Sequence, residues 1–260
     1  METVERKYKL PSNGYFGGPK EVTIRPMSTK EEKILYASKD YGFINKIVEN
    51  CVVEPKDFTL DNLHESDILF LLYMIRELTF GPTYYQSGNC PDCGFKQDIE
   101  INITDMTYNI LDTEGLEEKL TFKLPMCGDT ISMVLLSHKD IAEIDNYVKR
   151  LTRRGDLQDP ESYQYVLTFA RMVQTRNGEE FPEERAKIDY LNNLHMADFA
   201  AIKDVLSDIK IGLDLRIYYN CSNCGGEEEV FGTVCPEFFR PSKHWFNRNP
   251  WIWKYDCKCY

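Results

Sequence analysis

Two pairs of cysteines in the sequence have the spacing of a metal-binding turn. Each pair forms a Cys-x-x-Cys turn that is followed directly by a glycine. Such a turn lets two thiolates point at one ion, and the glycine lets the chain fold back without a Cβ atom in the way. Two turns together supply four thiolates, a usual ligand set for structural zinc. The spacing therefore predicts one zinc site with the ligands Cys90, Cys93, Cys221 and Cys224.

The cysteine pairs belong to a longer repeat. Residues 60–94 align with residues 191–225 without a gap, at an offset of 131. Ten positions are identical, where average residue usage would give roughly two by chance. In the first copy they are Leu60, Asn62, Leu63, His64, Asp67, Gly81, Asn89, Cys90, Cys93 and Gly94. We interpret this as an internal duplication, in which each copy is a helix followed by a hairpin that carries a cysteine pair.

The elements that position the cysteines can be predicted from periodicity. In the first copy, apolar residues at helical spacing follow Ser66 and Asp67, either of which can cap the helix. In the second copy we expect the helix to begin at Met196. Alternating apolar residues around each cysteine pair indicate strands, so each pair should lie at the tip of a hairpin. If a pseudo-twofold axis relates the halves, the tips meet on it and the ion clamps the halves together.

These patterns predict an α+β fold with two repeats and a tail. The first repeat, of strands, helices and a hairpin, occupies residues 1–104. An acidic segment at 104–119 has the composition of a linker, and the second repeat occupies residues 120–235. Residues 236–260 form an extended tail that contains all three tryptophans, with five basic and two acidic residues. We expect this tail to dock on another protein; packing on its own domain ranks second, and nucleic acid binding third.

Other interpretations of the cysteines remain open. The thiols could be free on surface turns. A redox pair would instead open a helix after a strand, whereas both pairs here lie between strands. A further alternative places ligands in two separate sites that use Cys127, Cys235, Cys257 or Cys259. The single shared site is favoured because the two pairs are equivalent copies and the other cysteines have no repeated partner.

The remaining reactive residues do not form a catalytic pattern. His64 and His195 are repeat copies that lie 26 residues before each cysteine pair, and we expect them to cap or pack the helix rather than bind metal. His138 and His244 have no suggestive neighbours. The sequence has no Ser/His/Asp order, phosphate-binding glycine loop or His-Glu-x-x-His motif. We therefore expect no enzymatic activity and no small-molecule substrate.

Composition narrows the class of protein. The net charge is −11, from 42 acidic and 31 basic residues, which argues against a protein that binds duplex DNA. No segment has the apolar length needed to cross a bilayer, and the first residues lack the apolar region of a secretory signal. We expect folding in a reducing cytoplasm, where nine cysteines fit metal binding better than disulfides.

The order of motifs resembles a known family. A strand leads into Arg25-Pro26-Met27-Ser28-Thr29 and a Glu-rich helix, and Cys90-Pro91-Asp92-Cys93-Gly94 opens an Ile-x-Ile-x-Ile strand. This layout, mainly over residues 20–235, resembles the baseplate hub proteins of T-even-like contractile-tailed phages. The resemblance implies a non-enzymatic structural protein of the virion, assembled in the host cytoplasm into the hub, beside the spike and the tape-measure protein. It also implies that the four paired cysteines hold the fold.

The residues add one expectation about assembly and leave one alternative function. A duplicated module with an adhesive tail suits a subunit that occurs in several copies in a ring and bridges its neighbours. The alternative is a zinc-ribbon interaction or nucleic-acid module of a transcription complex. Such a module would carry basic residues near its cysteines, whereas Glu227, Glu228 and Glu229 follow the second pair here.

Overall fold

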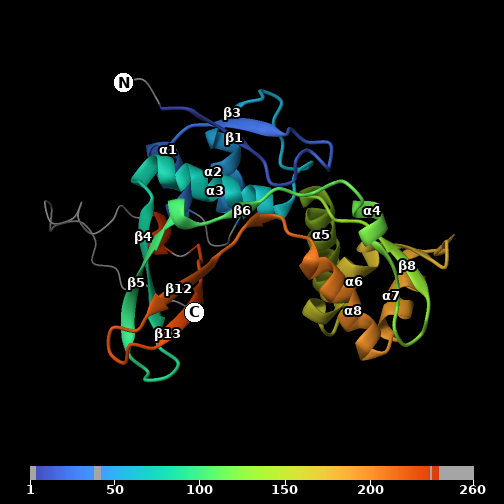
Figure 1. Cartoon of the computed structure of the whole chain (residues 1–260). Helices are drawn as coiled ribbons and strands as arrows, with labels where there is room; N and C mark the ends of the chain where they lie inside the picture. The colour runs from blue at the N-terminus through green and yellow to red at the C-terminus, as the bar shows by residue number, and fades with distance from the viewer. Residues whose placement is uncertain (1–3, 38–41, 235, 240–260) are drawn as a thin grey trace, which may run out of the picture.

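The computed structural model describes residues 4–37, 42–234 and 236–239. Cys235, Cys257, Cys259 and His244 therefore lie outside the described residues, as does all of the expected tail from Arg240 onward. The described chain mixes helices with small antiparallel sheets, so the predicted α+β class is confirmed. Figure 1 shows an arch with a crest and two limbs. Within the described residues, none of the helices combines the length and apolarity required to traverse a bilayer.

The first part of the chain forms the crest of the arch. Its sheet has the order β1-β2-β3, and helix α3 runs beneath it through a core that includes Ile24, Val48 and Leu71. Nine apolar or aromatic positions of α3, from Ile68 to Ile75 and beyond, face this core or the neighbouring elements, which makes α3 the central helix. The elements are β1 (Arg6–Lys9), β2 (Glu21–Ile24), α1 (Thr29–Ala37), α2 (Phe43–Cys51), β3 (Val52–Glu54) and α3 (Glu65–Phe80).

The second part forms the helical limb. Its sheet has the order β10-β9-β8-β7 and packs with the helices around a separate core that includes Ile131, Val173 and Ile202. The elements are α4 (Leu116–Lys119), β7 (Thr121–Lys123), β8 (Thr130–Met133), α5 (His138–Arg154), α6 (Pro160–Met172), β9 (Val173–Arg176), β10 (Glu179–Glu180), α7 (Glu184–Asn192) and α8 (Met196–Asp208).

The segment 104–119 has more structure than its linker-like composition predicts. The η1 turn (Ile103–Asp105) is followed by β6 (Tyr108–Asn109), which pairs with β11 (Gly212–Leu213) near the end of the chain. Leu111 and Leu116 are buried in the second core. Acidic residues flank these few buried leucines, so composition alone did not indicate that the segment packs against the second core.

The two parts share several local features. Strands β2 and β8 each pair antiparallel with a preceding and a following strand, and a register shift occurs at Thr23/Ile24 in one and at Ser132/Met133 in the other. In each part, one helix ends and the next strand begins at the following residue, at Cys51 and at Met172. A Ser residue three positions before an acid caps the helix that follows β2 and the one that follows β8.

The central helices of the two parts also begin alike. The N-cap of α3 is His64, whose Nδ1 accepts from the Ser66 backbone N–H. The expectation of Ser66 or Asp67 as N-cap is wrong, because Asp67 is already inside the helix and its carboxylate accepts the His64 N–H. Helix α8 begins at Met196 as expected, after His195 at the N-cap.

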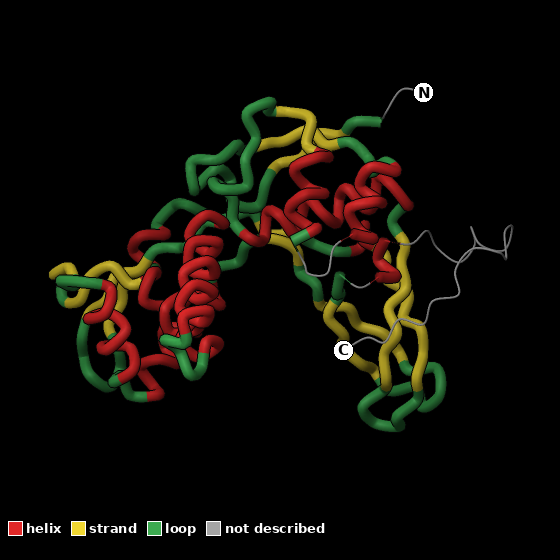
Figure 2. The backbone as a smooth tube through the Cα atoms, turned by 180° about the vertical axis from the view of Figure 1, so that it is seen from behind, coloured by secondary structure: helices red, strands yellow, loops and turns green. Residues whose placement is uncertain are grey.

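Two hairpins form the other limb. Figure 2 shows them side by side, with their tips far from the crest. One follows α3 and consists of β4 (Thr83–Asn89) and β5 (Lys96–Asn102); the other consists of β12 (Arg216–Asn220) and β13 (Glu227–Phe231). The short η2 helix (Pro236–Phe239) follows the second hairpin, and its Phe238 is fully buried in the first core.

Candidate metal centre

The four paired cysteines lie together at the tips of the two hairpins. All four sulfur atoms are within 4.8 Å of one another. The distance between Cys90 Sγ and Cys224 Sγ is 3.8 Å, and that between Cys93 Sγ and Cys221 Sγ is 3.7 Å. Both distances join one hairpin to the other, so residues 134 and 128 positions apart in the chain contribute to one cluster.

These distances suit a metal ion better than disulfides. A disulfide requires a sulfur–sulfur distance of about 2.05 Å, and all four cysteines are free thiols. A tetrahedron with Zn–S bonds of about 2.3 Å has edges of about 3.8 Å, which matches the two distances between the hairpins. The residues present therefore fit a four-coordinate zinc ion, and the donor set is the one that structural zinc prefers.

The backbone of both turns follows the same pattern. In the first, the Cys90 N–H donates to the Phe95 carbonyl and the Gly94 N–H donates back to the Cys90 carbonyl. In the second, Cys221 makes the same two bonds with the residues at the corresponding places. Gly94 and Gly225 have φ angles of 71° and 74°, in the left-handed region that a residue with a Cβ rarely adopts. The local geometry explains the glycine after each cysteine pair.

Polar side chains fasten the hairpins to each other beside the sulfurs. Gln97 Oε1 accepts from the Ser222 backbone N–H and hydroxyl at 2.9 and 2.6 Å. Further up the strands, Gln86 donates to the Phe231 carbonyl and accepts from Thr233. Sequence reasoning missed these two glutamines, because a polar residue on an exposed strand gives no signal of its partner.

Polar groups surround the sulfur atoms. The Asn223 amide, together with the backbone N–H of Phe95, lowers the pKa of Cys93 to about 6. The Cys93 N–H favours the thiolate of Cys90, but burial and the neighbouring thiols outweigh it and raise the pKa of Cys90 to about 12. Glu228 Oε1 lies 3.4 Å from Cys90 Sγ. A divalent cation would compensate the negative charge that four thiolates and this carboxylate place in one spot.

Comparison with known proteins identifies the family of this chain. Residues 1–240 match the family described as T4 bacteriophage base plate protein. The chain belongs to this family. No curated protein and no solved structure gave a match. The match spans both parts and both hairpins, so this baseplate protein is a structural component of the virion tail, and the phage resemblance of the sequence is confirmed.

The other cysteines of the baseplate protein with a described position lie elsewhere. Cys51 is buried in the first core, at the end of α2. Cys127 is exposed on the turn before β8 and lines a separate pocket. Neither contributes to the cluster at the hairpin tips.

The histidines of the baseplate protein have structural roles where they are described. His64 and His195 cap helices α3 and α8, so their predicted capping or packing role is confirmed. His138 lies between the two parts, where its Nδ1 is 2.6 Å from Glu65 Oε1. The sequence offered no neighbour for His138, because Glu65 is 73 positions away.

Proposed function

We propose that this protein is a subunit of the baseplate hub, in which a structural zinc ion bound by Cys90, Cys93, Cys221 and Cys224 clamps the two hairpins. The observation that carries the zinc site is the pair of sulfur–sulfur distances, 3.8 and 3.7 Å, across the two hairpins. The subunit occurs in several copies in a ring and bridges neighbouring hub, spike or tape-measure proteins. The layout of motifs that resembles hub proteins supports this place within the baseplate.

We further infer that the chain arose by duplication of one module, now residues 1–104 and 120–235. The shared strand order, the register shifts at corresponding positions and the matching helix caps support this inference. Corresponding carboxylates add to it: Asp67 accepts from the Ser12 N–H, and Asp198 accepts from the Met126 and Cys127 N–H groups. Each is fully buried and holds the turn between two strands.

The charge of the hairpins disfavours the nucleic-acid alternative. Residues 83–102 and 212–233 together contain seven acidic and two basic residues. A phosphate backbone would meet repulsion on this limb, whereas nucleic-acid modules place Lys and Arg near the contact. A protein partner is therefore the better match for this limb of the arch.

Metal analysis tests the zinc site. We expect one zinc per chain in purified protein, and its loss in Cys93→Ser and Cys224→Ser, the two exposed ligands. Cys127→Ser is the matched control, since Cys127 is also exposed but lies outside the cluster, and it should retain zinc. Wild-type protein without zinc, or equal zinc in all three variants, would contradict the site.

Chelation and cross-linking test the other two parts of the proposal. Because each part has its own core, removal of zinc should leave the helical circular dichroism unchanged and speed amide exchange in β4, β5, β12 and β13. Cross-linking mass spectrometry on purified tails should join this chain to hub, spike or tape-measure proteins. Cross-links only to peripheral baseplate proteins would overturn the hub assignment.

A further inference from the structure

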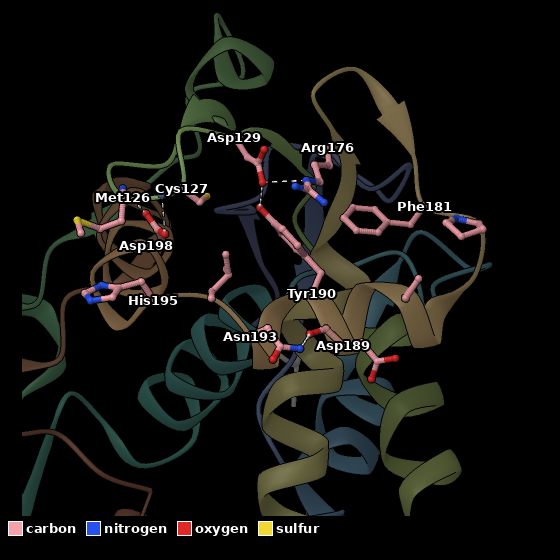
Figure 3. A pocket seen from close by; sticks show the side chains of 13 residues that line it. Met126, Cys127, Asp129, Arg176, Phe181, Asp189, Tyr190, Asn193, His195 and Asp198 are labelled. Carbon is pink, nitrogen blue, oxygen red and sulfur yellow. Dashed lines mark hydrogen bonds and ion pairs between the residues drawn. The ribbon is translucent and has the colours of Figure 1, made fainter.

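An open pocket lies beside the start of helix α8. It has a volume of about 800 Å³ and is bounded by the turn before β8, the segment before α7, and the end of α7 through the start of α8. Figure 3 shows His195 and Met126 on one side and Phe181 on the other, with Tyr190 between. Met126, which lines the pocket, is 60% exposed, and Met196, the residue after His195 in the chain, is 74% exposed.

The corresponding place in the first part is closed by a loop of the chain itself. Phe16 stacks on the His64 imidazole, with ring centroids 5.6 Å apart and planes at 18°. The loop approaches closely, since a Cβ atom on Gly18 would lie 2.4 Å from the Asn62 carbonyl oxygen. Leu63, under this loop, is fully buried.

The two places correspond residue by residue. Asn193, Leu194 and His195 line the pocket and are the repeat copies of Asn62, Leu63 and His64. The turns above them share the pattern Lys-Leu-Pro-x-x-Gly, at residues 9–14 and 123–128. The Leu of each turn donates its N–H to the residue that closes the turn, Lys20 in the first part and Asp129 in the second.

The second turn lacks five residues that the first contains. In the first part, Tyr15–Pro19 lie between Gly14 and Lys20. In the second part, Gly128 is followed directly by Asp129. His195 is consequently exposed and Leu194 only partly buried, whereas their copies lie under Phe16 and Gly18. The pocket is thus the place that the missing loop would fill.

Hydrogen bonds within the chain hold the walls of the pocket in place. Asp198 fixes the Met126 and Cys127 N–H groups at 2.6 and 3.1 Å. On the other side, Asp129 accepts from Arg176 and from the Tyr190 hydroxyl, at 2.8 and 3.1 Å. A preformed, partly apolar pocket with exposed rims is the kind of site that receives an anchoring aromatic residue.

We propose that this pocket docks a glycine-flanked aromatic side chain from another tail protein, which stacks on His195 as Phe16 stacks on His64. In the first part of the chain, the stack of Phe16 on His64 is the same contact made within one chain. This proposal rests on the proposed duplication for the correspondence of the two places. It rests on the proposed baseplate role for the source of the partner. It is independent of the zinc site, so its failure would leave the metal analysis untouched.

The first test uses a peptide with the sequence of residues 12–20, Ser-Asn-Gly-Tyr-Phe-Gly-Gly-Pro-Lys. In nuclear magnetic resonance titrations of the full chain, we expect upfield shifts of the His195 ring protons, as a stacked ring requires. A peptide with Phe16→Ala should bind roughly five- to tenfold more weakly. His195→Asn, which retains a helix-capping acceptor but has no ring, should weaken the wild-type peptide similarly. Equal binding of both peptides, or no binding, would overturn the proposal.

The second test closes the pocket within the chain. Insertion of Tyr-Phe-Gly-Gly-Pro between Gly128 and Asp129 should protect the amide of Leu194 from exchange and abolish peptide binding, and the same insertion with Ala for Phe should do neither. A graft that leaves peptide binding intact would overturn the proposal. Self-association of the wild type that the graft removes would make a second copy the occupant, and would equally overturn the assignment to another tail protein.

Discussion

Arg76 is an arginine that is buried completely in the first core. Its guanidinium donates to the carbonyl oxygens of Gly81, Thr83 and Phe238, and lies 5.5 Å from the centre of the Tyr84 ring. Burial lowers the pKa of Arg76 to about 10. One side chain thus joins the end of α3 and the start of β4 to the η2 helix, whose Phe238 is 162 positions from Arg76 in the chain.

The contacts of Arg76 predict that its loss destabilises the fold. Arg76→Met should lower the free energy of unfolding by about 3 kcal/mol, because it leaves three carbonyl groups without their donors while preserving most of the volume. Arg6→Met is a matched control: Arg6 pairs with Glu77, the residue after Arg76 in α3, but is 54% exposed, so its loss should cost below about 0.5 kcal/mol. Urea unfolding measures both, and equal effects would contradict the role of Arg76.

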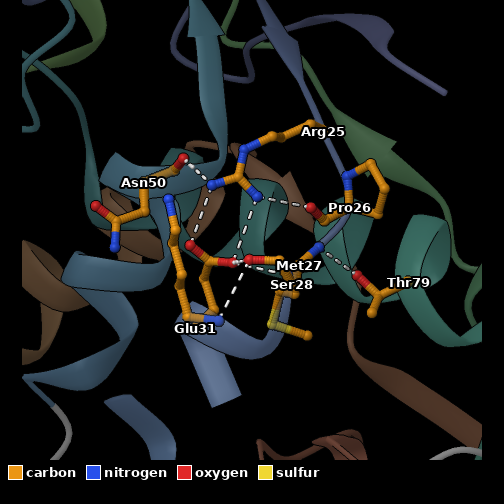
Figure 4. A network of polar contacts seen from close by, with 8 residues as sticks. Arg25, Pro26, Met27, Ser28, Glu31, Asn50 and Thr79 are labelled. Atoms are coloured by element: carbon orange, nitrogen blue, oxygen red, sulfur yellow. Dashed lines mark hydrogen bonds and ion pairs between the residues drawn. The ribbon is translucent and has the colours of Figure 1, made fainter. Parts of the chain in front are cut away.

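At the scale of elements, the start of α1 is held by a buried ion pair. Glu31 is 1% exposed, and its Oε1 lies 3.0 Å from Arg25 Nη2. Figure 4 shows Arg25 joining Glu31, the Pro26 carbonyl and the Asn50 carbonyl, so that strand β2, α1 and α2 meet at one guanidinium. Ser28 also donates to Glu31 through its N–H and hydroxyl. Helix α5 begins with a similar cap of Ser137 and Asp140, but Val134 lies three positions before Ser137, where Arg25 lies three positions before Ser28.

Helices α1 and α5 should differ in how much their acidic capping residues contribute to stability. Burial alone would raise the pKa of Glu31, but Arg25 and Ser28 outweigh it and lower the pKa to about 2. Glu31→Gln should therefore cost on the order of 2 kcal/mol at pH 7. Asp140→Asn removes a cap without a buried arginine and should cost only about 1 kcal/mol.

The pH dependence follows from the lowered pKa. The contribution of the ionised Glu31 is complete above about pH 4.5 and is lost as the pH falls toward 2, so the difference between wild type and Glu31→Gln should shrink at pH 3. Urea unfolding at pH 7 and pH 3 measures it. A difference that stays constant with pH would show that the ion pair does not stabilise the helix start.

At the scale of the molecule, the two parts meet where α5 begins. The N–H groups of His138 and Lys139 donate to the Leu63 and Asp61 carbonyls at 2.7 and 3.2 Å, so the loop before α3 caps α5. His138 adds an ion pair with Glu65, with side chains 14% and 49% exposed. The crest and the helical limb are therefore joined by directional contacts near the middle of the arch (Figure 1).

The contact between His138 and Glu65 at this junction should make stability depend on pH. The hydrogen bond to Glu65, opposed by burial, raises the pKa of His138. A raised pKa in the folded state means that the contribution is complete below about pH 6.5 and is lost as the pH rises through the folded value. His138→Gln should thus reduce the melting temperature more at pH 5.5 than at pH 8.5. Because Glu65 is half exposed, the effect should be about 0.5 kcal/mol, and a larger loss at high pH would contradict the assignment.

The sequence by itself determined the features that depend on neighbouring residues and on repetition. Cysteine spacing and the following glycine specify a turn within six residues, and the repeated sequence placed the start of α8 at Met196. Ten identities at one offset linked the two cysteine pairs before any contact was known. These are local properties of the chain, or comparisons of the chain with itself. Neither requires knowledge of the tertiary contacts.

Only the tertiary structure decided what partners distant residues take. It brought Gln97 to Ser222, Arg76 to the Phe238 carbonyl and His138 to Glu65. It also placed Met126, Tyr190 and His195 around one pocket, although they come from separate segments of the chain. The type and spacing of a polar side chain do not indicate its partner, because water satisfies its hydrogen bonds equally well until packing excludes the water.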